Sequence, residues 1–103
     1  MLSVHVRCYF QFMDTKSLVK IAKALSDPNR LRILQEISLA PQVACADLFE
    51  VAPVSQPSMS HHVKALVEAG LVESRKEGRC VHLSVNPEKL EELETFLGML
   101  KGK

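Results

Sequence analysis

The segment "VSQPSMSHHVKALVEAGLV", residues 54–72, predicts an amphipathic helix followed by a change of period. Ser55 is a good N-cap, Pro57 is tolerated in a first turn, and Gly70 is a good C-terminal stop. At about 100° per residue, one stripe of the helix is apolar and should face the core. That stripe holds Met59, Val63, Leu66 and Val67. After Gly70 the period becomes two, which predicts strands.

The polar residues of this helix lie opposite or beside the stripe, mostly near its N-terminal end. They are Gln56, Ser58, Ser60, His61 and Lys64. Such side chains at a helix start suit the major groove of DNA, where base edges offer donors and acceptors. The hydroxyls and Lys64 also suit phosphates, assisted by the positive end of the helix dipole. The alternative is a solvated face without function, which would more often carry paired Glu and Lys.

Two adjacent histidines occupy the middle of the helix. Neighbouring side chains diverge by roughly 100° on a helix, so His61 and His62 cannot chelate one ion as residues at i and i+4 can. His61 should point outward. His62 lies at the edge of the core stripe, where an interior hydrogen bond and a phosphate contact are both open.

The remaining elements complete a known arrangement. Helices are expected over 14–25, capped by Asp14 or Thr15, and over 28–39, capped by Asp27. A short helix should span 44–52 before Pro53, strands 71–76 and 79–85 should flank a turn at Glu77–Gly78, and Asn86–Pro87 should open a last helix through residue 101. This order predicts a mainly α fold with a small β-hairpin, a winged helix-turn-helix. The recognition helix is then about residues 55–69, and the wing is about residues 71–85.

The wing carries three cations for a DNA backbone or minor groove, namely Arg75, Lys76 and Arg79. Because the net charge is only +1, DNA binding must depend on local charge and on duplication by dimerisation. Leu90, Leu93, Leu97 and Leu100 form a narrow stripe on the last helix, typical of packing on one neighbour or on a second copy.

The chain of 103 residues fits one domain, which we place at 14–103. No apolar run reaches the length of a membrane span, and we expect a cytoplasmic protein. Residues 1–13 form an extension in which "MLSVHVRCYFQF" alternates as a strand does. Two hypotheses stay open: a true strand, or an over-extension, disordered or opportunistically folded, before a natural start at Met13.

With these residues in view, the chain resembles the ArsR/SmtB family of bacterial winged-helix repressors. The matching segments are "ALSDPNRLRIL", "ADL", "VSQPSMSHHVKALVEAGLV" and "RKEGRCVHLSV", in order and spacing, within residues 14–100. The resemblance implies a homodimer that packs its first and last helices across a two-fold axis. The interface would include Leu18 and Ile21 with the leucines of the last helix. It also implies an imperfectly palindromic operator that an inducer releases, and no enzymatic activity.

The sequence departs from the metal-sensing pattern of this family. Where many relatives have Cys-Val-Cys-Asp-Leu, this chain has Ala44-Cys45-Ala46-Asp47-Leu48, and its last helix has no histidine. We therefore expect Cys8, Cys45 and Cys80 to be structural or incidental, with Cys45 a small buried hydrophobe. Two alternatives stay open: a three-thiol site for arsenite or another thiophilic ion, and a redox pair. A further alternative for the whole chain is a protein-interaction module that has lost DNA binding.

Overall fold

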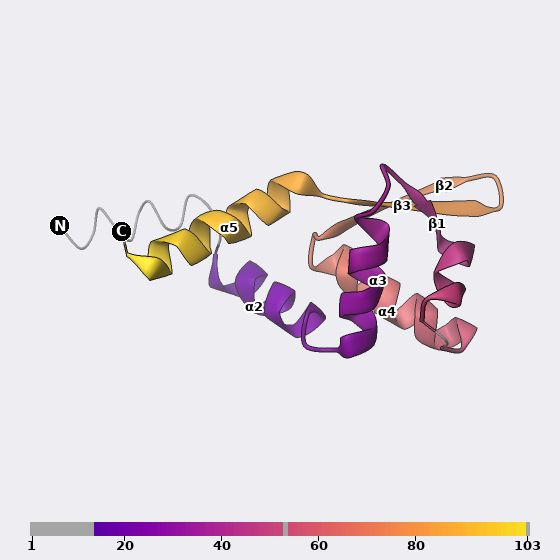
Figure 1. Ribbon diagram of the computed structural model, residues 1–103, viewed down its shortest axis with the longest axis horizontal. Coiled ribbons are helices and arrows are strands. Elements are labelled where there is room, and N and C mark those ends of the chain that lie inside the picture. Colours follow the sequence, from indigo (N-terminus) through magenta and orange to yellow (C-terminus); the bar gives the residue numbers. More distant parts are fainter. Residues whose placement is uncertain (1–13, 53, 103) are drawn as a thin grey trace.

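The computed structural model describes residues 14–52 and 54–102 (Figure 1). Its helices are α2 (Thr15–Ala24), α3 (Pro28–Ile37), the 3-10 helix η1 (Cys45–Glu50), α4 (Gln56–Glu68) and α5 (Pro87–Lys101). Its strands are β1 (Val43–Ala44), β2 (Val72–Glu77) and β3 (Cys80–Val85). The predictions for residues 1–13, including Cys8, and for Pro53 lie outside the described residues. Within them, every helix is too short or too polar to cross a bilayer.

Side-chain caps fix where the four α-helices begin. Asp14 accepts from the Ser17 backbone N–H at 2.8 Å, and Asp27 accepts from the Asn29 N–H at 2.8 Å. Ser55 and Asn86 cap α4 and α5 in the same way. Each cap satisfies backbone donors that the helix itself leaves free. The helix starts predicted from the sequence are therefore confirmed.

The pKa of Asp27 is lowered, and the balance has a clear physical origin. Desolvation opposes ionisation, but the backbone N–H groups of Arg30 and Asn29 and the charges of His62 and Arg30 outweigh it. Because its folded pKa lies below the unfolded value, this carboxylate stabilises the fold above the unfolded pKa. That contribution is lost as the pH falls through the folded pKa.

The sheet has three strands in the order β1-β3-β2, all antiparallel. The hairpin ladder runs from Val72 opposite Val85 to Glu77 opposite Cys80, so the turn is Gly78–Arg79. The predicted turn at Glu77–Gly78 was therefore displaced by one residue. The third strand, β1, was missed, because two residues show no alternation and their partners in β3 are distant in sequence.

Strand β1 also changes the helix after it. Pairing with β3 keeps the chain extended through Ala44, and Cys45–Glu50 then turn as a 3-10 helix, not as the predicted helix over 44–52. The core lies between α2, α3, α4 and the sheet, as predicted from the α4 stripe. Its largest fully buried side chains are Ile21, Ile33, Ile37, Leu48, Met59, Leu66, Leu71, Val72 and Leu83.

The last helix lies apart from this core. Figure 1 shows α5 leaving the sheet and extending along the same side as α2. Among the residues the structure describes, none in α5 is buried, and only Leu93 packs against the core cluster from its apolar stripe. A helix of this length with an uncovered leucine stripe is expected to pack on a further surface.

Gly70 fixes the angle between α4 and β2. Its φ of +83° places it in the left-handed region, and the Leu71 N–H reaches the Leu66 carbonyl at 3.1 Å in a Schellman motif. A Cβ at Gly70 would also lie 3.0 Å from Cε of Lys89.

We expect Gly70→Ala to lower the free energy of unfolding by about 1–2 kcal/mol, measured by urea denaturation. Gly78→Ala is the matched control, because Gly78 also has a positive φ but meets no atom within 4 Å of an added Cβ. It should cost less. Equal losses at the two positions would contradict the contact with Lys89.

Candidate nucleic-acid interface

The polar face predicted for α4 is presented to solvent. Gln56, Ser60, His61 and Lys64 are exposed, and Ser58 is half-buried. The buried residues of the same helix are Met59, His62 and Leu66. The first turn of α4 contains no acidic residue, so its free N–H groups and dipole leave this end favourable to anions.

The wing and α4 are brought together around one cavity of about 340 Å³. Gln56 and Ser60 line it from α4, and Arg79 lines it from the turn between β2 and β3. Three residues predicted separately, from a helix and from a hairpin, therefore border the same space. A helix-mounted pair of polar side chains beside a mobile cation suits simultaneous contact with base edges and a phosphate.

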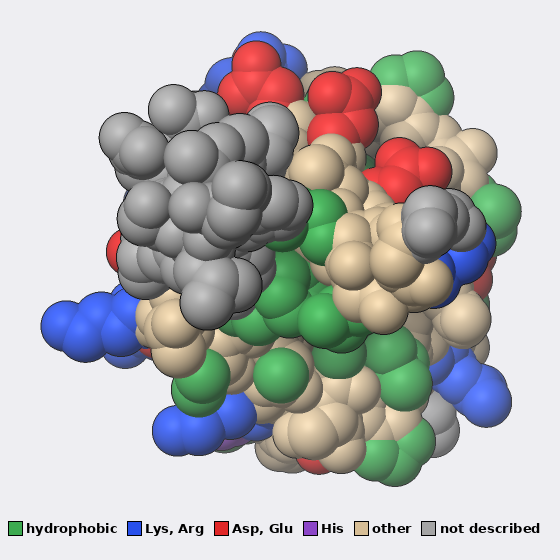
Figure 2. All heavy atoms as spheres, turned by 90° about the vertical axis from the view of Figure 1, so that its left-hand side faces the viewer, with side chains coloured by type: hydrophobic (Ala, Val, Ile, Leu, Met, Phe, Trp, Pro, Cys, Tyr) green, Lys and Arg blue, Asp and Glu red, His purple; other side chains and the backbone are tan. Residues whose placement is uncertain are grey.

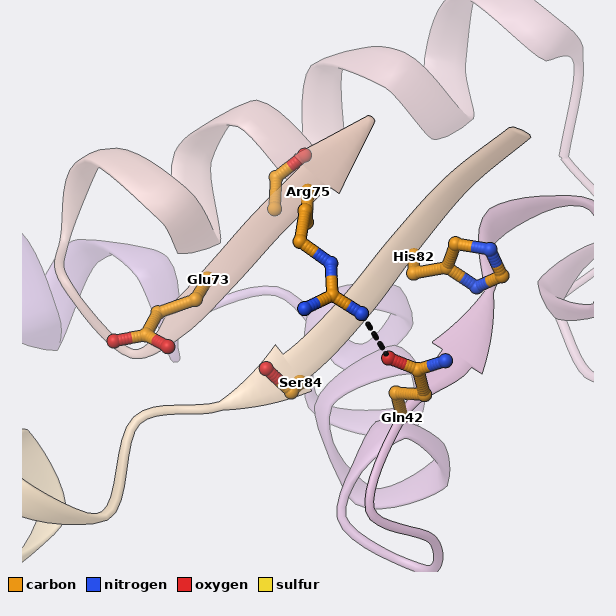
Figure 3. Close-up of a pocket in the computed structure, with 6 residues that line it drawn as sticks. Gln42, Glu73, Arg75, His82 and Ser84 are labelled. Atoms are coloured by element: carbon orange, nitrogen blue, oxygen red, sulfur yellow. Dashed lines mark hydrogen bonds between the residues drawn. The ribbon is translucent and has the colours of Figure 1, made fainter. Parts of the chain in front are cut away.

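Arg75 lies elsewhere on the wing. Figure 3 shows its side chain over the face of the sheet, directed toward Gln42, with His82, Glu73 and Ser84 on the same face. Its guanidinium donates to Oε1 of Gln42 at 3.1 Å and lies 3.2 Å from a Glu77 carboxylate oxygen. Arg75 thus has two competing partners that the sequence did not predict.

His62 points into the protein, which settles the alternative left open by the sequence. It is only 7% exposed, and its Nδ1 accepts a hydrogen bond from Nε of Arg30 at 3.3 Å. Buried polar groups need such partners. His62 is therefore corrected from a candidate DNA contact to an interior residue that positions α4.

Arg30, which sequence analysis did not single out, contacts both histidines. Its terminal nitrogens lie 3.4 Å from Nε2 of His61 and 3.1 Å from the Lys23 carbonyl. A guanidinium has donors but no acceptor, so the ring nitrogens facing it must accept. His61 then carries its proton on Nδ1, and His62 carries its proton on Nε2. No local pattern announces this contact, because Arg30 belongs to α3.

The described cysteines converge on the α4–wing cavity. Cys45 and Cys80 are both free thiols and both line it, Cys45 half-buried and Cys80 exposed. Cys45 packs against the core, as expected, but is not enclosed by it. Burial raises the pKa of the Cys45 thiol. In the part of the chain that the structure describes, no three His, Cys, Asp or Glu side chains are grouped to hold a metal.

The candidate dimer residues divide into two groups. Leu90, Leu97 and Leu100 are exposed, as are Val19 and Met99, and Figure 2 shows hydrophobic side chains gathered at the end of the molecule where α5 finishes. Leu18 and Leu93 are half-buried against the core. Ile21 is 1% exposed and is part of the core, so we correct its assignment to an intersubunit surface.

Comparison with known proteins matches these features. A helix-turn-helix domain family covers residues 25–75. The arsenical resistance operon repressor of Staphylococcus xylosus is 42% identical over 88 residues, which are 85% of this chain and 84% of the repressor. An ArsR-like transcriptional regulator from Rhodococcus sp. RHA1 superposes with a TM-score of 0.74 at 31% identity, over 84% of this chain and 80% of that one.

A second solved structure carries information about assembly. It is a homodimeric winged helix-turn-helix DNA-binding domain from Mycobacterium bovis, with a TM-score of 0.67 at 23% identity. It covers 84% of this chain and 79% of the other. At that identity the match bears on the fold alone, and it agrees with the winged helix-turn-helix predicted from the sequence.

We expect Arg30→Ala to lower the free energy of unfolding by about 1–3 kcal/mol, since it leaves a buried acceptor on His62 without its donor. Nitrogen-15 NMR of the imidazoles should show the Nδ1–H form of His61 in the parent and its loss in the variant. Arg32→Ala, which removes an exposed cation from the same helix, is the control and should change neither quantity. An unchanged His61 tautomer would contradict the assigned contact.

Proposed function

The chain belongs to the ArsR family of winged helix-turn-helix transcriptional repressors, and we propose that it binds operator DNA as a homodimer through α4 and the wing. The polar, exposed N-terminal face of α4 is the observation that carries this proposal. Family membership rests on the 42% identity to an arsenical resistance operon repressor across most of both chains. The protein acts on DNA without catalysing a reaction.

In the proposed complex α4 enters the major groove with Gln56, Ser58, Ser60 and His61 toward the base edges. The Arg30 contact leaves His61 an outward Nδ1–H donor, which suits an acceptor such as guanine N7 or O6, or a phosphate. Lys64 and the helix N-terminus take phosphates. An interaction module without DNA binding would instead present apolar side chains on this face, and α4 does not.

The wing supplies cations outside the groove. Arg79 at its tip and Lys76 are proposed to contact the backbone or the minor groove. Arg75 joins them only by leaving Gln42 and Glu77, an exchange of one exposed charged contact for another. The chain carries a net charge of +1, so binding depends on this local placement.

We propose that α2 and α5 form the dimer interface, with Val19, Leu90, Leu97, Met99 and Leu100 at its surface. Their exposure supports this, because a monomer would leave these apolar side chains in water. The homodimeric state of the Mycobacterium bovis domain is in line with it. Two-fold symmetry would present α4 twice and match an imperfect palindrome. We place this activity in the cytoplasm, where operator DNA is found.

Ser58→Ala and His61→Ala should each weaken binding to DNA from the protein's own promoter, by about 1–3 kcal/mol where a base contact is lost. Arg79→Ala should weaken binding to all sequences and reduce the slope of log affinity against log salt by about 1. Fluorescence anisotropy at several salt concentrations measures both.

Arg32→Ala serves as the control, since it removes an exposed cation of α3 outside α4 and the wing, and it should leave affinity and salt slope unchanged. If Ser58→Ala, His61→Ala and Arg79→Ala all bind as the parent does, the proposed interface is wrong.

Leu97→Glu should convert the dimer to a monomer, because a carboxylate would be buried against the partner's apolar surface. Analytical ultracentrifugation gives the mass, and operator affinity should fall with it. Leu39→Glu is the matched control, because Leu39 is 75% exposed but follows α3. A Leu97→Glu dimer with parental affinity would exclude α5 from the interface.

A further inference from the structure

The cavity between η1, α4 and β3 combines two kinds of wall. One wall is apolar and sulfur-rich, and the other is polar and belongs to the proposed DNA interface. The first contains Ala44, Cys45, Ala46, Phe49, Met59, Cys80 and Val81, and the second contains Gln56, Ser60 and Arg79. Its volume of about 340 Å³ is within the range of small-molecule sites.

The two thiols reach this cavity from different elements. Ala44 pairs with His82 in the β1–β3 ladder. Cys45 follows Ala44 directly, and Cys80 lies two residues before His82, so the antiparallel pairing carries both thiols to the same end of the sheet. Cys45 then belongs to η1 and Cys80 to the tip of the wing. A ligand that joined them would tie η1 to the wing.

The charges at the cavity disfavour a divalent cation. No carboxylate or imidazole lines it, and its one formal charge is the guanidinium of Arg79. A structural zinc ion takes four protein ligands, and the described residues around this cavity supply two thiols. Burial also keeps the Cys45 thiol protonated. The ligand that fits must bind two sulfurs, consume their protons and add no charge.

We propose that this cavity is the effector site of the repressor and that it binds a trivalent arsenical with one organic substituent through Cys45 and Cys80. The proposal rests on the repressor function proposed above and names its regulation. In the reaction, R–As(OH)2 condenses with two thiols. Two As–S bonds form and two As–O bonds break, the thiol protons leave in two water molecules, and arsenic stays trivalent. The neutral product places its substituent against Phe49 and Met59.

The site differs from a chelate along one helix. Both residues that flank Cys45 in sequence are alanines, so the second sulfur comes from the wing. It also differs from the three-thiol site considered in the sequence analysis, because Cys8 has no part in it. Inorganic arsenite prefers three thiolates, so it should bind this pair more weakly than a monosubstituted arsenical.

Binding at this site would oppose DNA binding directly. Gln56 and Ser60 on α4 and Arg79 on the wing form part of the same wall, so a bridged ligand fixes the spacing between two elements that must both fit the duplex. Coupling between two sites typically changes affinity by about 5–150-fold. We expect release of the operator.

The experiment uses the reduced full chain with phenylarsine oxide as the probe. Without DNA, intact-mass spectrometry and a thiol count should show one arsenical bound and two thiols lost per chain. With promoter DNA, anisotropy should show affinity falling by at least about tenfold. Cys45→Ser and Cys80→Ser should each bind DNA and fail to respond. Cys8→Ser, the matched control, should respond as the parent does.

Three results would overturn the proposal. The first is an arsenical adduct that survives in the Cys45→Ser, Cys80→Ser double variant. The second is a response to arsenite that requires Cys8. The third is a Cys45–Cys80 disulfide formed by hydrogen peroxide in a protein that ignores phenylarsine oxide. Failure of the untreated chain to bind promoter DNA would refute the repressor function instead, while the mass and thiol count would still test the site.

Discussion

The burial of one face of α4 is the constraint on which the rest of this protein depends. Met59, His62 and Leu66 are enclosed by α2, α3 and the sheet, and this packing fixes the rotation of the helix about its axis. Once that rotation is fixed, Gln56, Ser60, His61 and Lys64 have no place but the surface. The Schellman turn at Gly70 then sets the direction of β2 and, through it, the position of the wing relative to the helix.

Arg30 shows how the core and the interface share one contact. It satisfies a buried acceptor on His62 and an exposed ring nitrogen on His61, and it is anchored to the Lys23 carbonyl at the end of α2. Three helices therefore meet at one guanidinium. Because Arg is always charged, the imidazoles facing it are held neutral and in one tautomer. Packing here determines which hydrogen bond His61 offers to a base or a phosphate.

The α4–wing cavity gives the fold a means of regulation without a separate domain. Effector chemistry and DNA contacts occupy opposite walls of the same space, so they are coupled by geometry alone. The weak net charge is consistent with this design, because affinity that depends on a few well-placed groups is easily lost when those groups move. The uncovered stripe of α5 completes the scheme, since a partner subunit doubles these contacts.

The sequence by itself determined the order of elements, the four capped helices and the inward and outward faces of α4. Caps and periodicity act within a few residues, and these signals are local. It did not reveal β1, the 3-10 form of η1, the turn at Gly78–Arg79, the burial of Ile21 and His62, the role of Arg30 or the shared cavity of Cys45 and Cys80. Those features join segments distant in the chain. Only the packing of α3 against α4, and of β1 against β3, decides which of their side chains meet.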